Sequence, residues 1–314
     1  MLSLRTCLMA GVAGIGIAIA GATGASATPL VMTLDPSKTN LPAGGIIDPA
    51  TAAFMTDGAV FGGGSLIDIA GTGAGISSFQ KGNFNIASFQ LGGSNSPSNV
   101  NQPGHYQIFG TYFISTTGNF STATPGNGTF VATSVNSVDV TLYAIPSTGT
   151  FGTYNPPTPA ATFNSPPATL AGFGVTGEVG QFVIGTASLI NDGLATALAV
   201  TNGTSTAPLA TFTGDLLFTP AAGTTPLTCT GAPPCGFFQS PIELTFEVSV
   251  SNSIPPQSTS VTISGSDTLI SNTATGGGAL SFLAVPVPEP GSLTLLGMGL
   301  LGVAVARRRR RRRA

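Results

Sequence analysis

Residues 242–250 read Ile-Glu-Leu-Thr-Phe-Glu-Val-Ser-Val, an unbroken alternation of apolar and polar side chains. Successive side chains of an extended chain point to opposite faces, so the apolar residues share one face and the polar residues share the other. This pattern is typical of an antiparallel strand with one buried and one solvated face. It predicts a β-strand and sets the fold class for the regions around it.

Similar runs recur on both sides of this stretch, separated by turn signals such as Pro125-Gly126-Asn127-Gly128. The 43 glycines and 24 prolines leave little room for long helices. We therefore predict an all-β fold, an antiparallel β-sandwich of jelly-roll-like type that spans residues 28–271, as one large sandwich or two small ones. The alternation slips phase near Ser88, as at a β-bulge. The other predicted strands are residues 84–91, 105–116, 138–144, 209–219, 261–270 and 279–285.

Charge is sparse and unevenly distributed along the chain. Only 7% of the residues are charged, and seven of the ten basic residues form one block at residues 307–313. Between residues 28 and 290 the basic residues are Lys38 and Lys81, against all 12 acidic residues. Nucleic-acid binding needs clustered lysine and arginine, so this segment is predicted to bind no nucleic acid.

The N-terminus has the organisation of a secretory signal peptide. Arg5 precedes a short apolar run at residues 7–20, and Ala25-Ser26-Ala27 fits the small-residue cleavage pattern. We predict a signal peptide over residues 1–27, with Ala25 and Ala27 as the cleavage residues. The alternative is an N-terminal anchor that is not cleaved.

The C-terminus has three parts in a fixed order. Val287-Pro288-Glu289-Pro290 comes first, an apolar run at residues 291–306 follows, and an arginine block that includes Arg307, Arg308 and Arg309 ends the segment. As a helix, the apolar run would be roughly 24 Å long, slightly short of a hydrocarbon core of about 30 Å, and arginine side chains can extend its reach. We predict a transmembrane helix over residues 291–306, with the arginines on the cytoplasmic side.

These residues closely resemble the PEP-CTERM sorting signal of Gram-negative bacteria. The resemblance implies an exosortase as the processing partner and a transient anchor in the cytoplasmic membrane. The chain would then pass to the cell surface or extracellular matrix. A plain C-terminal anchor is the alternative. Residues 272–286 are predicted to form a Gly/Pro-rich tether between the sandwich and this signal.

A second resemblance involves the body of the chain. The segments at residues 185–190, 210–213 and 236–241 are similar in order to the later half of flocculation-associated PEP-CTERM proteins, and Gly110-Thr111-Tyr112 fits their earlier half. The resemblance implies a role in floc formation together with exopolysaccharide. It carries over no catalytic residue.

Chemically distinctive residues are few. Cys229 and Cys235 are predicted to form a disulfide outside the cytoplasm, with a reduced pair as the alternative. The one histidine, His105, is expected to be a surface residue at a strand end. We predict no catalytic residue, no metal site and no cofactor, although calcium held between loops stays open.

The sequence therefore predicts a non-catalytic, exported protein of the cell surface or matrix that contacts exopolysaccharide. The alternatives are an enzyme acting on extracellular polymer and a calcium-dependent carbohydrate-binding module.

Overall fold

A computed structural model describes residues 30–38, 46–121, 124–159, 163–190, 194–195, 198–201, 204–205, 209–229, 235–240, 246–254, 259–272 and 278–283. All of them belong to one of the two units into which the chain divides, Pro29–Ala284. The predicted signal peptide, the residues from Val287 to Pro290 and the predicted transmembrane helix with its arginine block lie outside the described residues. In the described part of the chain, no helix is both long enough and apolar enough to span a membrane.

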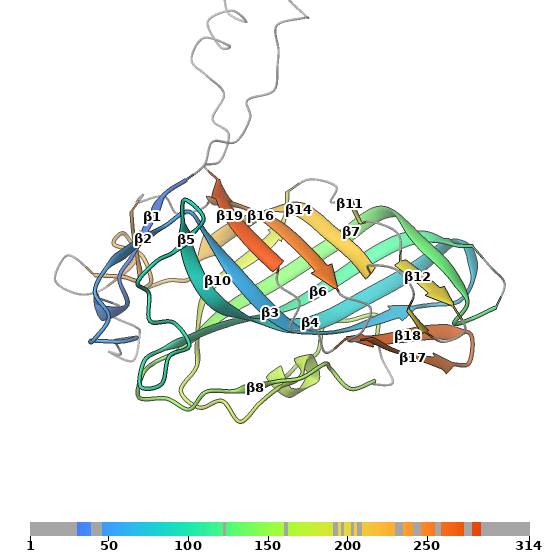
Figure 1. The fold of residues 1–314 in the computed structure, drawn as a ribbon, viewed down its shortest axis with the longest axis horizontal. Coiled ribbons are helices and arrows are strands. Elements are labelled where there is room, and N and C mark those ends of the chain that lie inside the picture. Colours follow the sequence, from blue (N-terminus) through green and yellow to red (C-terminus); the bar gives the residue numbers. More distant parts are fainter. Residues whose placement is uncertain are drawn as a thin grey trace, which may run out of the picture. The chain divides into compact units, whose positions relative to one another are not determined.

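The described residues form strands with two short 3-10 helices, so the predicted all-β class is confirmed (Figure 1). Every paired strand is antiparallel to its neighbour. The elements are β1 (Met32–Leu34), η1 (Pro36–Lys38), β2 (Phe54–Thr56), β3 (Gly58–Ile69), β4 (Gly73–Leu91), β5 (Ser94–Asn95), β6 (Gln107–Phe120), β7 (Gly128–Ile145), β8 (Thr153–Tyr154), η2 (Leu170–Phe173), β9 (Val175–Thr176), β10 (Phe182–Leu189), β11 (Leu194–Ala195), β12 (Leu198–Thr201), β13 (Thr204–Ser205), β14 (Leu209–Pro220), β15 (Phe238–Ser240), β16 (Phe246–Ile254), β17 (Thr259–Ser264), β18 (Asp267–Asn272) and β19 (Gly278–Leu283).

The largest sheet closes on itself. Its pairings run from β3 through β4, β6, β7, β10, β14, β16 and β19, and β19 pairs with β3 again. Opposite parts of this closed sheet face each other across a shared core, which is consistent with the predicted sandwich. The connectivity corrects the jelly-roll part of the prediction. Each strand of the circuit pairs with the next one in the chain, whereas a jelly roll returns strands by long crossing connections.

Strand β3 provides the closure, because three other strands pair with it. One edge of β3 pairs with β4 along the whole strand. The other edge is shared: β19 pairs with residues 58–61, and β18 pairs with residues 65–69. β19 confirms the strand predicted at residues 279–285, and it lies inside the segment 272–286 that is also predicted as a tether. Phe282 is buried while Ala279 and Ser281 are exposed, the alternation of a strand with one face on the core.

The structure confirms one further detail of the sequence prediction and corrects another. The predicted bulge near Ser88 is confirmed: Val60 pairs with Ser88 and Phe61 with Ile86, which leaves Ala87 as the extra residue. The predicted strand at residues 261–270 is instead a hairpin of β17 and β18. Gly265, with a φ of 64°, makes the turn that separates them, because glycine adopts this backbone conformation without steric cost.

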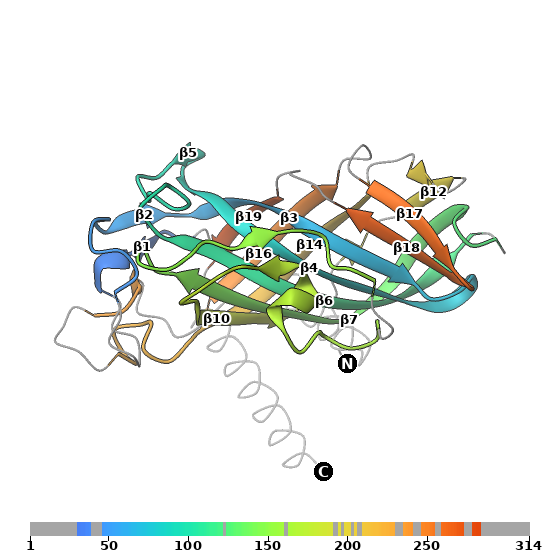
Figure 2. The same ribbon diagram turned by 90° about the horizontal axis from the view of Figure 1, so that it is seen from below.

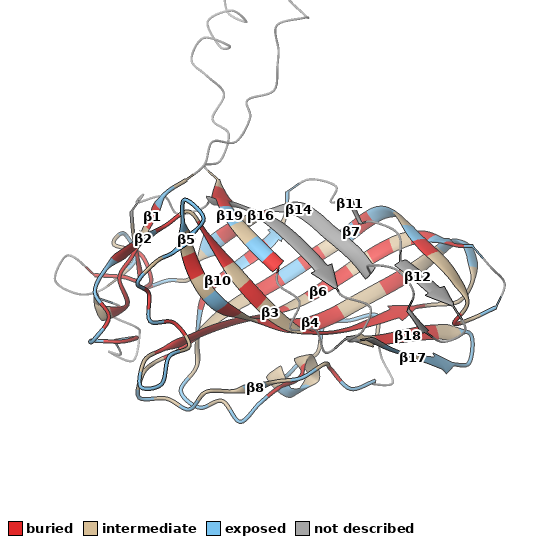
Figure 3. Cartoon of the chain, in the orientation of Figure 1, coloured by how far each residue is buried: buried red, intermediate tan, exposed pale blue. Residues whose placement is uncertain are grey.

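Aromatic rings and glycines pair across strands in the interior of the closed sheet. Phe84 lies directly opposite Gly110, and Phe61 lies opposite Gly278. A Cβ atom on Gly110 would come within 2.3 Å of the Phe84 ring, and one on Gly278 within 2.0 Å of the Phe61 ring. The missing side chains thus make room for the rings, which form part of the buried core seen in Figure 3.

The segment between β7 and β10, which carries β8, η2 and β9, crosses the outer face of the sheet, and its yellow-green ribbon lies in front of the sheet in Figure 2. We call residues 146–181 the strap. Asn83 on β4 holds the strap with its side-chain amide, which donates to the carbonyls of Asn155 at 2.7 Å and Phe173 at 2.6 Å. The Phe109 and Tyr143 rings stack beneath the strap at 4.9 Å. The proline-rich stretch between β7 and β10 is thus a surface connection.

We predict that Gly110→Ala lowers the free energy of unfolding by about 1–3 kcal/mol, because the new methyl group collides with the Phe84 ring. Denaturant unfolding measures this change. Gly152→Ala is the matched control, since its Cβ would come no closer than 3.3 Å to another atom. A loss as small as the control's, or a loss that Phe84→Leu fails to relieve in a double-mutant cycle, would contradict the proposed contact.

Candidate functional site

Polar side chains form a continuous outward row on β6 and β7. Asn136 donates to the Thr117 hydroxyl at 3.0 Å and accepts from the Ser134 hydroxyl at 3.3 Å. The Thr133 hydroxyl donates to the Thr117 carbonyl at 3.1 Å. The β6–β7 register shifts twice in this region, between Ser115 and Thr116 and between Thr117 and Gly118. The shifts leave Thr133 and Asn136 as extra residues of β7, and these bulges, together with the alternation of β6, bring the polar side chains to one face. We call this row the polar ladder; it consists of Ser115, Thr117, Asn119, Thr133, Ser134 and Asn136.

The polar ladder offers hydroxyl and amide groups without charge. Asn119, Thr133, Ser134 and Asn136 are exposed to solvent. Hydroxyls and amides both donate and accept hydrogen bonds, which suits neutral polyhydroxylated ligands. The polar ladder contains hydroxyls but no carboxylate or imidazole that could act as an acid or a base or activate a hydroxyl.

A second polar cluster joins two segments that are distant in the sequence. The Asp48 carboxylate lies 2.7 Å from Nδ1 of His105, and it accepts a hydrogen bond from the Thr51 hydroxyl at 2.6 Å and another from the Ala50 amide at 3.0 Å. Asn99 donates to the Thr51 hydroxyl at 3.1 Å. We call these residues the Asp48–His105 clasp. It ties the loop before β2 to the loop before β6.

Asp48 is only 1% exposed, whereas the His105 side chain is 27% exposed. Burial by itself would raise the pKa of Asp48. The hydrogen bonds from Thr51, His105 and Ala50, together with the attraction of a protonated His105, outweigh burial and hold the pKa below its usual value.

The geometry of the clasp differs from that of a catalytic triad. In a triad the carboxylate orients one imidazole nitrogen and the nucleophile lies at the other. Here the Thr51 hydroxyl lies 3.4 Å from Nδ1, the same nitrogen that faces Asp48. Thr51 is thus placed to fix the carboxylate and is not placed for activation by the imidazole. Sequence reasoning missed Asp48 and Thr51, since no spacing signal links them to His105.

A third polar group, Asp68 and Lys81, is covered on the outer face of β3 and β4, at 4% and 3% exposure. Burial, and next the charge of Asp267, raise the pKa of Asp68 to about 6, although Lys81 acts in the opposite direction. Burial lowers the pKa of Lys81. The Lys81 ammonium lies 4.6 Å from the centre of the Phe163 ring in the strap. Lys81 therefore contacts the strap through its ammonium.

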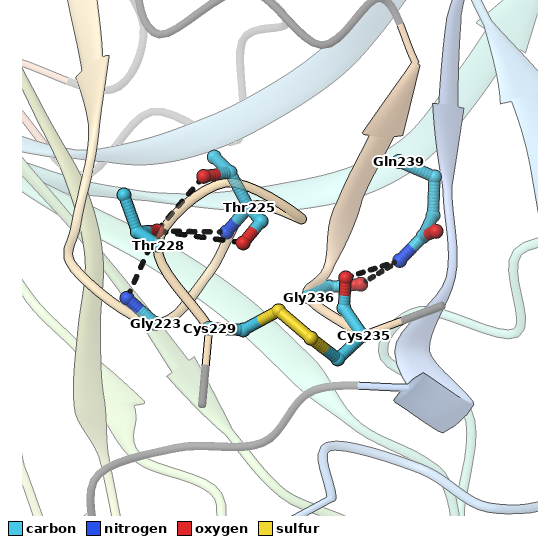
Figure 4. Close-up of a disulfide and its surroundings, with 7 residues drawn as sticks. All are labelled: Gly223, Thr225, Thr228, Cys229, Cys235, Gly236 and Gln239. Atoms are coloured by element: carbon cyan, nitrogen blue, oxygen red, sulfur yellow. Dashed lines mark hydrogen bonds between the residues drawn. A yellow bond between two sulfur atoms is a disulfide. The ribbon is translucent and has the colours of Figure 1, made fainter. Parts of the chain in front are cut away.

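The structure joins Cys229 and Cys235 by a disulfide with a Cα–Cα distance of 6.1 Å (Figure 4). Hydrogen bonds hold the chain on both sides of the disulfide. The Thr228 hydroxyl accepts from the Gly223 amide at 3.1 Å, and the Gln239 side chain donates to the Cys235 carbonyl at 3.0 Å. The disulfide comes directly before Phe237 and Phe238, two buried rings of the core. It therefore fixes the entry of this segment into the core.

Residues 286–311 match the family model of the PEP-CTERM protein-sorting motif. The chain carries a PEP-CTERM sorting motif. The match includes Val287, Pro288, Glu289, Pro290, Arg307, Arg308 and Arg309, the predicted sorting residues. No curated protein and no solved structure matches the chain.

The PEP-CTERM motif implies that the chain is exported, is processed by an exosortase and is sorted to the cell surface. The motif is a sorting signal, and its residues are separate in the sequence from those of the polar ladder and the clasp. Ala25 and Ala27, the predicted cleavage residues of the signal peptide, lie outside the described residues, and that cleavage remains a prediction. In the described ranges, no three residues among His, Cys, Asp and Glu come together as a metal site would require.

We predict that Asp48→Asn lowers stability at pH 7 by about 2 kcal/mol, because a buried carboxylate with charge-assisted hydrogen bonds is lost. A lowered pKa stabilises the fold above the pKa of the unfolded state, about 3.9, and this contribution disappears as the pH falls through the folded-state pKa. The native chain should therefore lose more stability between pH 5 and pH 3 than the variant.

Thermal unfolding across this pH range tests the prediction. Asp139→Asn, at an exposed position of β7, serves as the control. It should lose as much stability between pH 5 and pH 3 as the native chain does. Equal acid sensitivity of the native chain and Asp48→Asn would show that the clasp does not stabilise the fold.

Proposed function

We propose that this exported chain is a non-catalytic protein of the cell surface or extracellular matrix that promotes biofilm or floc formation through contact with exopolysaccharide. The observation that carries the proposal is the polar ladder on an exported chain with a PEP-CTERM motif. Its contacts would be many weak hydrogen bonds along a polymer, each contributing about 1 kcal/mol net, so affinity would arise from multivalency.

The charge of the ladder is compatible with a neutral polymer. The polar ladder has no charged member, whereas the acidic excess of residues 28–290 would repel a strongly acidic polymer. The ladder's hydroxyl and amide groups already bond to one another on the strand surface, which reduces the loss of side-chain freedom when a ligand binds.

The alternatives are an enzyme acting on polysaccharide and a carbohydrate-binding module. The one observation that favours an enzyme is the Asp48–His105 clasp, which has a carboxylate and a partly exposed imidazole in contact. An enzyme would further need a nucleophile or a bound water near the other ring nitrogen. Binding without bond cleavage requires only the polar ladder, and we therefore prefer the non-catalytic proposal.

Replacement of the exposed part of the ladder should weaken polysaccharide binding. We predict that Thr133→Val, Ser134→Ala and Asn136→Ala together reduce retention on exopolysaccharide from the producing cells by about tenfold or more. Co-sedimentation measures the change. The matched control is Thr176→Val, Thr186→Val and Ser188→Ala, three exposed positions on β9 and β10.

Retention equal to that of the native chain would refute the role of the ladder. His105→Ala should bind the polymer and support aggregation as the native chain does. If His105→Ala abolished aggregation while the protein stayed folded and exported, the enzymatic alternative would replace our proposal.

Deletion of residues 286–314 tests the role of the motif. We expect the truncated chain to be exported, to lose its surface retention and to accumulate in the medium. The β-sheet circular dichroism should persist, because the closed sheet ends at β19 (Gly278–Leu283). Loss of the β-sheet signal, or unchanged retention of a folded truncated chain, would contradict this expectation.

A further inference from the structure

The interior of the closed sheet is not completely filled. A cavity of about 110 Å³ lies between its walls, and its lining side chains come from β1, β3, β4, β6, β7, β10, β14, β15 and β19, together with Phe237. Closed antiparallel sheets of eight strands have an interior that side chains just fill or that holds one small ligand. We propose that this cavity binds one small, uncharged, apolar molecule of about the size of benzene.

The chemistry of the lining favours an apolar occupant. The described side chains around the cavity are aliphatic and aromatic except for Gln80 and Tyr112. These two polar groups bond to each other, since the Gln80 side-chain nitrogen lies 3.2 Å from the Tyr112 hydroxyl. A buried water needs two to four polar partners, and this lining offers few. An apolar cavity of about 150 Å³ in another protein stays dry and binds benzene or xenon.

The same lining disfavours a charged ligand. Burial is the main cause that raises the pKa of Tyr112 to about 12, so the phenol is neutral at physiological pH. Among the side chains that the structure describes, none in the lining belongs to Asp, Glu, Lys, Arg or His. A charged molecule would lose its hydration and gain no counter-charge in return. The uncharged lining of the cavity therefore selects neutral molecules.

The cavity persists because the rings around it are held against the walls. Phe84 occupies the space beside Gly110, and Phe218 occupies the space beside Gly185, where a Cβ would come within 2.1 Å of the ring. Phe61 and Phe84 also contact each other, with their ring centres 5.2 Å apart. Rings that pack against glycines and against one another have little freedom to rotate into the cavity. The middle of the sheet therefore stays open although its walls are bulky.

Binding of fluorobenzene to the full chain, followed by fluorine NMR, tests the proposal. We expect saturable one-to-one binding in the millimolar range or tighter. Ala187→Leu places extra methyl groups in the cavity and should weaken binding by about tenfold or more. Ser188→Ala, the exposed neighbour on β10, is the matched control and should bind as the native chain does. The charged analogue 4-fluorobenzoate should not bind.

A second variant keeps the test decisive if Ala187→Leu fails to fold. Ile114→Ala enlarges the cavity and should admit 1-fluoronaphthalene, which the native chain excludes. The proposal is overturned if the native chain shows no saturable fluorobenzene binding, if folded Ala187→Leu binds equally well, or if the benzoate competes. Equal binding of 1-fluoronaphthalene by the native chain and Ile114→Ala would also overturn it, because the ligand would then lie outside the cavity.

Discussion

Closure of the sheet along β3 is the constraint on which the remaining structure depends. β3 must meet β4 on one edge and both β18 and β19 on the other, and every strand between them must keep its register. A slip of one residue would turn a strand's apolar side chains outward. The bulge at Ala87 helps β4 to keep its apolar side chains on the inner face. Ile86 and Phe89 are three residues apart and both buried, which a regular strand would not permit.

Closure also divides the chain's chemistry between inside and outside. The interior holds rings, glycines and a small apolar space, whereas the exterior of β6 and β7 holds hydroxyls and amides. Because the side-chain period of a strand is two, adjacent residues serve these two environments. A ligand in the cavity and a polymer on the polar ladder would thus contact the same strands without competing for the same side chains.

The sequence predicts what is local and misses what depends on distant contacts. The alternation around residues 138–144 and the phase slip near Ser88 are local, and both match the structure. The sorting motif is read from consecutive residues and needs no tertiary contact to be recognised. Closure escaped prediction because Gly62-Gly63-Gly64 interrupts the alternation of β3. The clasp escaped it because Asp48 and His105 are 57 residues apart, and the seating of rings on glycines appears only when strands are paired.

The placement of the two lysines has a consequence for survival outside the cell. Proteases of trypsin-like specificity cut after lysine or arginine, and between residues 28 and 290 the chain offers only Lys38 and Lys81. The strap covers Lys81, so a protease of this kind meets a single accessible cleavage point, the exposed Lys38. A folded body with so few cleavage points would resist secreted proteases of this specificity, and the scarcity of charge thereby becomes a source of durability.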